Sequence, residues 1–542
     1  MKKLLALLVS LLGAMMLFAA CAGNETAPAT PTPQQTPSGN QEAAAPTPSP
    51  AAAAAGYRDI IRVGLDVDIN MLDPRLSTGT GNQRVIEQIF DGLLDLDANL
   101  NPIPVLATHW ENPDELTWIF HLREGVQFHN GQDFGAEDVR HTFMSIIDPD
   151  FASPIRGLFN WIESIDVIDD HTVQFNLLFP FSPIISVMDR GIIPRNADEM
   201  DDFGMNPVGT GPYRFVELNR NVSALVEANP LYWGEQQPRT QSIEFFIIPD
   251  NTTRVAALEA GDIDLVHSPL SPMDIARLRD DDRFTVTEMG GLALTFLNFN
   301  QQAEVLRERE VRQAIAHMID RDTIANHIYR GMDAPASSGL LPGTWSWSDS
   351  VQNFPFDPAR GQEILEEAGF TMGGDGFFQR NGVTLTVNLS THTEDPNRIQ
   401  AIEFIQSTLM ANGIDARVST AEWATFFATV AGGTYEIALL GLTNIVDPDR
   451  YFYLRFRTDA PNNEGGFSNE QLDAYVDEAR RVSDQARRAE LYQRAAQIVN
   501  DEVAHHVLLN QGYIVMHARE LSGFEPRPNG SFRNMKLVTI AE

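Results

Sequence analysis

Residues 385–440 read LTVNLSTHTEDPNRIQAIEFIQSTLMANGIDARVSTAEWATFFATVAGGTYEIALL and change pattern four times. Residues 385–391 alternate apolar and polar side chains as a strand does, and residues 397–411 place isoleucines and a leucine at helical spacing, with Gly413 just beyond. A second strand, a short helix and a nearly continuous apolar strand are then predicted at residues 414–420, 422–430 and 435–440. This order of elements is typical of a parallel α/β unit.

Ligands of parallel sheets lie beyond the carboxyl ends of the strands. In this unit that rule brings three loops to one edge, at residues 391–393, 420–423 and 441–444. We therefore expect a binding site at this edge, with candidate contacts from His392, Trp423, Thr443 and Asn444.

The rest of the chain divides into a strand-rich first half and a more helical second half. Amphipathic helices are predicted at residues 311–319 and 491–499. Strands separated by turn residues are predicted in the first half at residues 60–67, 117–122, 171–177, 223–228 and 243–248. The first half should be α+β, and the 486 residues from Tyr57 onward are enough for two or three lobes.

The N-terminus has the layout of a secretory signal peptide. Lys2 and Lys3 precede an apolar stretch, and Ala19 and Ala20 form a small-residue cleavage site before Cys21, the only cysteine of the chain. A cysteine at the cut resembles a bacterial lipobox, so residues 1–20 are predicted to be a signal peptide and Cys21 to be lipidated. An ordinary signal peptide with a chance cysteine is the alternative.

Residues 21–56 contain mainly alanine, proline, threonine and glutamine, which predicts a disordered tether. The chain has a formal net charge of −35, and Lys536 is its only lysine beyond the leader. Such a charge disfavours nucleic acid and anionic lipid headgroups as partners. The sequence contains no Gly-Lys-Ser/Thr of a P-loop, and with one cysteine it forms no internal disulfide.

Several short motifs occur in a fixed order along the chain, and together they resemble the extracellular solute-binding proteins of family 5. These motifs are LDP at 72–74, IFDGLL at 89–94, LTW at 116–118, LREGVQFHNG at 122–131, AEDV at 136–139, VGTGPY at 208–213, NPLYW at 229–233 and VRQAI at 311–315. The resemblance runs from about Ile61 to Phe524 and implies the substrate-binding component of a peptide, nickel or oligosaccharide ABC importer.

The fold implied by this resemblance is a two-lobed, hinged clamshell of the periplasmic-binding-protein type, α/β with mixed sheets and with α+β elements in lobe I. Lobe I would contain residues 57–294 and 511–542, and lobe II residues 295–510. The chain would cross between them near residues 295–298 and 510–512. The parallel unit would then lie wholly in lobe II, with its loop edge toward the ligand.

Further candidate contacts come from three other places. Trp345 and Trp347 lie in one loop, and residues 77–82, which include Thr80 and Gly81, resemble a family loop that approaches the ligand. Asp447 is explained locally as a helix N-cap before Pro448, but direct ligand contact by Asp447 or Asp449 remains the alternative. The motif at 208–213 is predicted to be structural, because its glycines and proline shape a turn.

In dipeptide-binding relatives an aspartate just upstream of this element pairs with the α-amino group of the peptide. Residues 441–446 contain no acid, and Leu442 replaces the usual tryptophan. A buried ammonium without a counter-charge is costly, so the sequence favours a mostly neutral ligand near Asn444. If the ligand has a free amino group, Asp447 or Asp449 is the expected counter-charge.

We expect an extracytoplasmic, membrane-anchored lipoprotein that captures a small solute, an oligopeptide by family usage, and passes it to a membrane permease. The alternatives are an oligosaccharide or another neutral solute, or a receptor that presents its ligand to a sensor. The protein is expected to be a monomer, to lack enzymatic activity and to need no cofactor. No metal site is expected, because the spacing of His121, His129 and His141 matches no compact ligand set.

Overall fold

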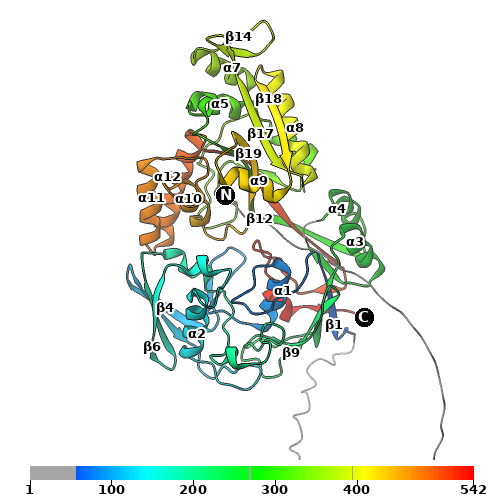
Figure 1. Ribbon diagram of the computed structural model, residues 1–542. Helices are drawn as coiled ribbons and strands as arrows, with labels where there is room; N and C mark the ends of the chain where they lie inside the picture. Colours follow the sequence, from blue (N-terminus) through cyan, green and yellow to red (C-terminus); the bar gives the residue numbers. More distant parts are fainter. Residues whose placement is uncertain (1–55, 268–269, 394) are drawn as a thin grey trace, which may run out of the picture. The chain divides into compact units, whose positions relative to one another are not determined.

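A computed structural model describes residues 56–267, 270–393 and 395–542. The predicted signal peptide, Cys21 and nearly all of the predicted tether therefore lie outside the described residues. In the described part an eleven-stranded sheet runs in the order β18-β17-β19-β12-β20-β11-β1-β10-β9-β8, with β13 also paired to β20 (Figure 1). Two of its strands, β12 (Phe284–Phe299) and β20 (His505–Ala518), are long and antiparallel to each other.

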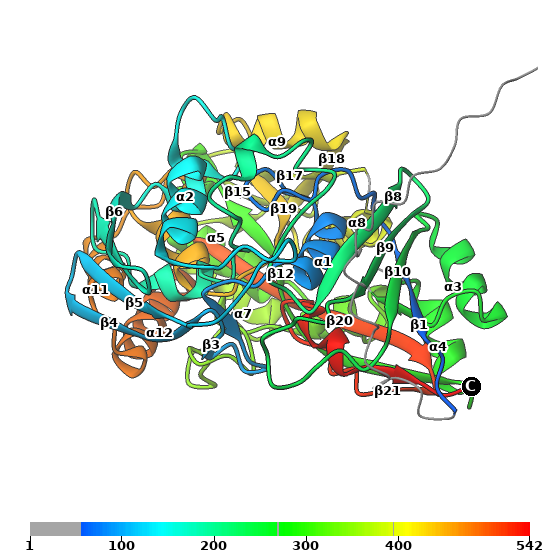
Figure 2. The same ribbon diagram turned by 90° about the horizontal axis from the view of Figure 1, so that it is seen from below.

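The N-terminal end of this sheet is mixed, as an α+β region should be. Strand β1 pairs in parallel with β10 and β11, whereas β8, β9 and β10 form an antiparallel meander that Figure 2 shows side by side. The elements of this region are β1 (Ile60–Leu65), α1 (Thr80–Ile89), β8 (Tyr213–Asn219), β9 (Ser223–Ala228), β10 (Ser242–Ile247), α3 (Asn251–Ala260), β11 (Leu265–His267) and α4 (Pro272–Arg279).

A separate four-stranded antiparallel sheet, in the order β4-β5-β7-β6, comes from the first half of the chain. Alternate residues of β5 are buried, and these pack with helix α2 and with Trp161 and Phe175 in one apolar core. The elements of this region are β2 (Leu94–Leu96), β3 (Pro102–Pro104), β4 (Ala107–Asp114), β5 (Thr117–Leu122), α2 (Ala136–Ile147), β6 (Ile162–Asp169) and β7 (Thr172–Leu177). The five strands predicted for the first half are thus confirmed.

The predicted strand–helix–strand–helix–strand unit is also confirmed. Strand β17 pairs in parallel with both β18 and β19, and β12 then joins β19 in antiparallel orientation. Its elements are β17 (Thr386–His392), α8 (Pro396–Ala411), β18 (Asp415–Ala421), α9 (Trp423–Ala431) and β19 (Ile437–Leu442). Helix α8 begins where Asp395 accepts hydrogen bonds from the backbone N–H groups of Asn397 and Arg398, and Gly413 past its end has a φ of +88°.

Strand β19 is apolar throughout because it is covered on both faces. Ile437 and Leu439 pack in the core that includes α8, whereas Ala438 and Leu440 pack in a second core with Phe426 of α9. Helices around this sheet complete the two cores: α5 (Arg309–His317), α7 (Pro358–Glu367), α10 (Asp449–Phe456), α11 (Glu470–Arg481) and α12 (Gln485–Asp501). The short elements are α6 (Arg321–Thr323), β13 (Ala334–Pro335), β14 (Thr371–Met372), β15 (Phe378–Arg380), β16 (Val383–Thr384), β21 (Leu521–Ser522) and β22 (Thr539–Ile540).

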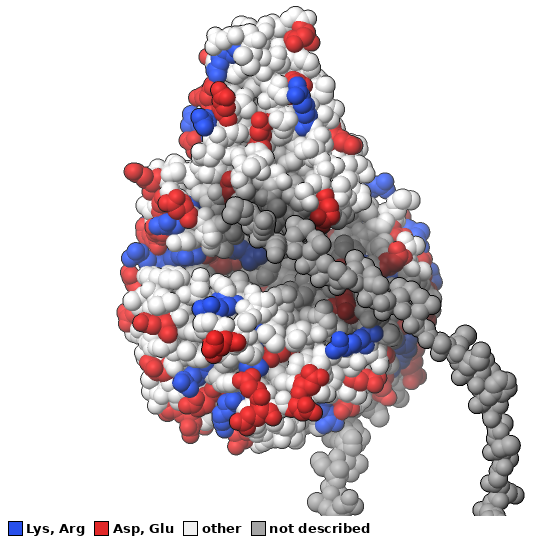
Figure 3. All heavy atoms as spheres, in the orientation of Figure 1, with Lys and Arg blue, Asp and Glu red and all other residues white. Residues whose placement is uncertain are grey.

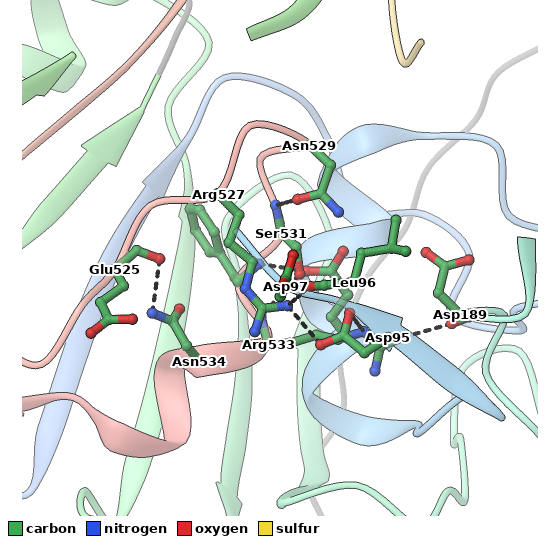
Figure 4. A network of polar contacts seen from close by, with 12 residues as sticks. Asp95, Leu96, Asp97, Asp189, Glu525, Arg527, Asn529, Ser531, Arg533 and Asn534 are labelled. Atoms are coloured by element: carbon green, nitrogen blue, oxygen red, sulfur yellow. Dashed lines mark hydrogen bonds and ion pairs between the residues drawn. The ribbon is translucent and has the colours of Figure 1, made fainter. Parts of the chain in front are cut away.

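The C-terminal segment is tied to the first half of the chain by two half-buried arginines (Figure 4). Arg527 forms an ion pair of 2.6 Å with Asp95 and also donates to the carbonyl of Leu96. Arg533 lies 3.6 Å from the same carboxylate and donates to the carbonyl of Asp189. Ile61 and Ile540 share one apolar core, so the two ends of the described chain also belong to one packed region.

Candidate functional site

The carboxyl ends of β17, β18 and β19 meet at one edge of the sheet, as the parallel pattern predicts. His392 at the end of β17 is directly opposite Ala421 at the end of β18, and the N–H of Thr393 donates to the carbonyl of Ala421 over 3.0 Å. The loop after β19 follows Leu442 on the other side of β17. These loops place His392, Trp423, Thr443 and Asn444 along the edge.

Trp423 is the first residue of α9 and presents an aromatic surface at this edge. Its side chain is 44% exposed, so Trp423 is not a core residue. The ring lies 5.1 Å from His392 in an edge-to-face arrangement and stacks on Phe427 at 5.7 Å. An exposed indole held by two other rings offers a rigid flat surface to a ligand.

Arg398 lies at the same edge and was not predicted as a site residue. Its Nη1 donates to Nε2 of the buried His392 over 2.9 Å, and its Nε lies 3.2 Å from Asp395. Because a guanidinium can only donate, the facing imidazole nitrogen accepts. A Cβ on Gly441 would lie 2.2 Å from Arg398 Nη2, so a glycine at the end of β19 leaves room for the guanidinium.

The sequence does contain a signal for Arg398. Asp395 and Pro396 mark the start of a helix directly after a predicted strand, which places a basic residue in the first turn at the carboxyl edge of the sheet. The edge thus carries a cation and an anion, Arg398 and Asp395, next to the aromatic surface of Trp423.

Asn444 and Thr443 are exposed in the loop that follows β19. Asn444 has a φ of +57°, a left-handed conformation that asparagine adopts more readily than most residues. The carbonyl of Thr443 accepts a hydrogen bond from Arg450, and the N–H of Ile445 donates to the carbonyl of Leu292 over 2.9 Å. The loop is therefore anchored to the segment where β12 is irregular.

Asp447 and Asp449 are buried and committed to ion pairs. Asp447 lies 2.9 Å from Arg488, and Asp449 accepts two hydrogen bonds of 2.7 Å from Arg480. Burial by itself would lower the pKa of Arg488, but Asp447 outweighs this effect and the pKa is raised. We assign both aspartates to structural roles rather than to counter-charges for a ligand.

The local explanation of Asp447 also agrees with the structure. Its Oδ1 accepts from the N–H of Asp449 over 2.9 Å, and Pro448 already has helical torsion angles, although α10 is assigned from Asp449. Asp447 thus caps the first turn of α10.

The two tryptophans of the loop at residues 343–347 differ. Trp345 packs against Tyr492, with Arg488 over its ring at 5.1 Å, so it belongs to the apolar core around the buried ion pairs. Trp347 is 41% exposed and lies in a turn closed by its N–H donating to the carbonyl of Thr344. Ligand contact by Trp347 stays a prediction.

On the N-terminal part of the sheet, the start of α1 borders a hollow of about 320 Å³. Thr80 lines it, whereas Gly81 packs against the chain behind: a Cβ there would lie 2.9 Å from the carbonyl oxygen of Asp68. Position 81 therefore needs a glycine because the backbone at Asp68 passes too close for a side chain. The hollow is lined by Val67, Asp68, Asn70, Met71, Leu76, Thr78, Gly79, Thr80 and Asn82.

The pairing between β12 and β20 is interrupted between Gly290 and Leu294. There the side chain of Asn510 donates to the carbonyls of Gly291 and Ala293 over 2.9 and 3.0 Å. The N–H of Gly512 donates to the buried carboxylate of Asp333 over 3.0 Å. Side chains thus replace the regular ladder where the two long strands pass from one part of the sheet to the other.

The motif at 208–213 is structural, but for a different reason than predicted. Neither Gly209 nor Gly211 has a positive φ. Each is needed because the chain passes close by: a Cβ on Gly209 would lie 2.0 Å from the carbonyl oxygen of Ile89, and a Cβ on Gly211 would lie 2.5 Å from that of Gln88. His129 packs on the same turn, accepting from the N–H of Gly209 and lying 3.0 Å from the carbonyl of Gly211. Burial lowers the pKa of His129 to about 4.

Charges of both signs are interspersed on the face of the molecule in Figure 3. Many of the arginines pair with carboxylates, as Arg360 does with Glu363 and Glu367. Over the part of the chain that the structure describes, no helix combines the length and apolarity needed to cross a bilayer.

Comparison with known proteins gives a consistent answer. Residues 101–464 match the profile of bacterial extracellular solute-binding proteins, family 5 Middle. Di/tripeptide-binding protein 1 of Pseudomonas aeruginosa is 28% identical over 465 residues, which cover 80% of this chain and 85% of the relative. The dipeptide-binding protein of Escherichia coli is 28% identical over 471 residues, covering 80% and 86%.

Solved structures agree with the predicted fold class. HbpA2 from Haemophilus parasuis superposes with a TM-score of 0.81 at 23% identity, covering 89% of this chain and all of that one. DppA from Helicobacter pylori in complex with the peptide STSA superposes with a TM-score of 0.71 at 26% identity, covering 90% and 99%. The fold is the two-lobed α/β fold of periplasmic binding proteins, as predicted. This chain belongs to the bacterial extracellular solute-binding proteins of family 5.

Proposed function

We propose that the protein captures a short peptide outside the cytoplasmic membrane and delivers it to an ABC permease. The observation that carries this proposal is the edge formed by β17, β18 and β19, where an exposed indole lies beside a guanidinium and a carboxylate. The named functions of the relatives, di- and tripeptide binding, support the same class of ligand.

The charges at this edge suit a zwitterion better than a neutral sugar. Arg398 and Asp395 offer one group of each sign within the first turn of α8, and Asn444 offers an amide on the next loop. The sequence favours a mostly neutral ligand because residues 441–446 contain no acid. Asp395 also caps a helix and pairs with an arginine, but its side chain is 32% exposed, whereas that of Asp447 is 9% exposed, so Asp395 is the accessible counter-charge for a free-amino peptide.

We further propose that peptide capture closes the lobes about the irregular segment of β12 and the facing residues of β20. Lobe I would contain residues 57–294 and 511–542, and lobe II residues 295–510. A ligand that contacts both the hollow at α1 and the edge of β17 favours the closed state. Such a protein binds and releases its ligand unchanged and acts as a monomer, without cofactor or catalytic residues.

A thermal-shift screen of the purified protein tests the assignment. We expect di- to pentapeptides to raise the melting temperature in a concentration-dependent way, because a ligand that binds only the folded state stabilises it. A response to neutral oligosaccharides but to no peptide would overturn the peptide proposal while leaving solute binding in place. A response to no solute at all would argue against capture.

Cys21 is proposed to carry a lipid that anchors the protein to the membrane. The basis is the leader and the single thiol of the chain, in residues outside the described part. In cells that express the Cys21→Ser variant, we expect the protein to leave the membrane fraction. If the variant stays membrane-bound to the same extent as the parent, the anchor lies elsewhere.

A further inference from the structure

A pair of histidines faces each other on the exposed side of the hairpin formed by β4 and β5. His109 and His121 are directly opposite in the strand register, and their rings stack at 4.1 Å with an angle of 7°. Cross-strand pairs of this kind bring side chains close together on one face of a sheet. The other face of the hairpin carries Trp118 and Phe120, which are buried in the core.

Glu111 completes the group from the same strand as His109. It lies two residues further along β4, so its side chain points to the same face, and its Oε1 lies 2.9 Å from His121 Nε2. One ring nitrogen from each histidine and one carboxylate oxygen lie within 4.8 Å of one another. Glu111 and His109 are exposed and His121 is half-buried, so solvent ions can reach all three.

We propose that His109, Glu111 and His121 form a binding site for a divalent transition-metal ion of the zinc type. Two imidazole nitrogens and one carboxylate oxygen are a ligand set that zinc accepts, with water in the fourth position. Tetrahedral zinc with ligand distances of about 2.1 Å places its donor atoms roughly 3.4 Å apart. Glu111 Oε1 and His121 Nε2 are 2.9 Å apart and need to separate by about 0.5 Å to admit the ion, and the exposed His109 needs a side-chain rotation.

The surroundings support a cation here. Asp169, at the end of β6, lies in one cross-strand row with Thr172 of β7 and His121 of β5. Asp169 thus adds negative charge to the face of the sheet that carries the proposed site. The sheet order places β4 at an edge, so the metal would crosslink this edge strand to β5.

This site is separate from the proposed peptide edge, because its residues lie on β4 and β5 and none lies on β17, β18 or β19 (Figure 1). It also differs from the trio considered in the sequence. His129 is half-buried on the turn at 208–213, and His141 pairs with Asp198 at 3.2 Å. Of that trio, only His121 takes part in the proposed site.

Equilibrium dialysis of tag-free, chelator-treated protein against zinc tests the proposal. We expect one zinc ion per chain and weaker binding as the pH falls, because protons compete with the metal for the imidazole nitrogens. His109→Gln, His121→Gln and Glu111→Gln should each weaken binding roughly 10- to 100-fold, since a direct ligand matters at least as much as an outer-sphere partner. His327→Gln, at an exposed histidine on another element, is the control and should bind like the parent.

Zinc should also raise the melting temperature of the parent and of His327→Gln, but not of the double variant His109→Gln/His121→Gln. Cobalt absorption in the visible range reports the geometry independently of stability. Absence of stoichiometric zinc on the parent would overturn the proposal. So would zinc binding that is equal in all variants, because the ion would then lie at another site.

Discussion

Asp447→Ala is expected to lower the free energy of unfolding by about 3–5 kcal/mol, because it leaves Arg488 as a buried charge without its carboxylate. The side chains of the pair are only 8% and 9% exposed, and their atoms lie 2.9 Å apart. The same substitution removes the side-chain oxygen that caps the first turn of α10. Urea unfolding of parent and variant measures the difference.

A double-mutant cycle separates the cost of leaving Arg488 unpaired from the cost of losing the cap of α10. Removing both charges in Asp447→Ala/Arg488→Met leaves no unpaired buried ion, so this variant should be more stable than Asp447→Ala alone. Glu367→Ala breaks an exposed pair with Arg360 and is the control, with an expected cost of about 0–1 kcal/mol. If Asp447→Ala lowers the free energy of unfolding no more than the control does, Asp447 is solvated and is again a candidate ligand contact.

Asp333→Asn is expected to stabilise the protein at pH 8 and to have little effect at pH 4. Burial, with a smaller contribution from Asp395, raises the pKa of Asp333 from 3.8 to about 6, although the N–H of Gly512 and Arg398 favour the charged form. The folded state therefore binds more protons than the unfolded state between these values. Its stability falls as the pH rises through that window.

Asparagine keeps an acceptor for the N–H of Gly512 and has no charge to bury. A shift of about 2 pKa units at about 1.4 kcal/mol each predicts a gain of about 3 kcal/mol above pH 7. Unfolding measured at several pH values gives the two curves, which should coincide near pH 4 and diverge toward pH 8. A difference that does not change with pH would show that Asp333 is ionised normally; Asp349→Asn, at an exposed carboxylate, controls for the loss of one negative charge.

The parallel unit was predictable because its signals are local. The alternation in residues 385–391, the helical spacing from Ile399 to Leu409 and the turn at Gly413 each depend on neighbours within a few positions. The rule for parallel sheets then brings the three loops to one edge without further information. Trp423 and Asn444 follow from that rule alone.

Contacts between distant segments were not predictable in the same way. Asp447 and Arg488 are 41 residues apart, and no pattern in the sequence joins them. Whether His109 and His121 face each other depends on the strand register of their hairpin, and this register shifts on both sides of the pair. A one-residue change of register would turn one ring to the buried face, so spacing in the sequence could not decide it.

A calorimetric titration with a peptide that raises the melting temperature most directly tests peptide capture at the edge of β17, β18 and β19. We expect one peptide per parent chain, and Trp423→Ala and Asn444→Ala should each bind about ten- to a hundredfold more weakly while unfolding cooperatively. Phe356→Ala, which removes an aromatic ring of similar exposure from another loop, should bind like the parent. If all four proteins bind the peptide with equal affinity, the ligand does not lie at this edge and the proposed site is wrong.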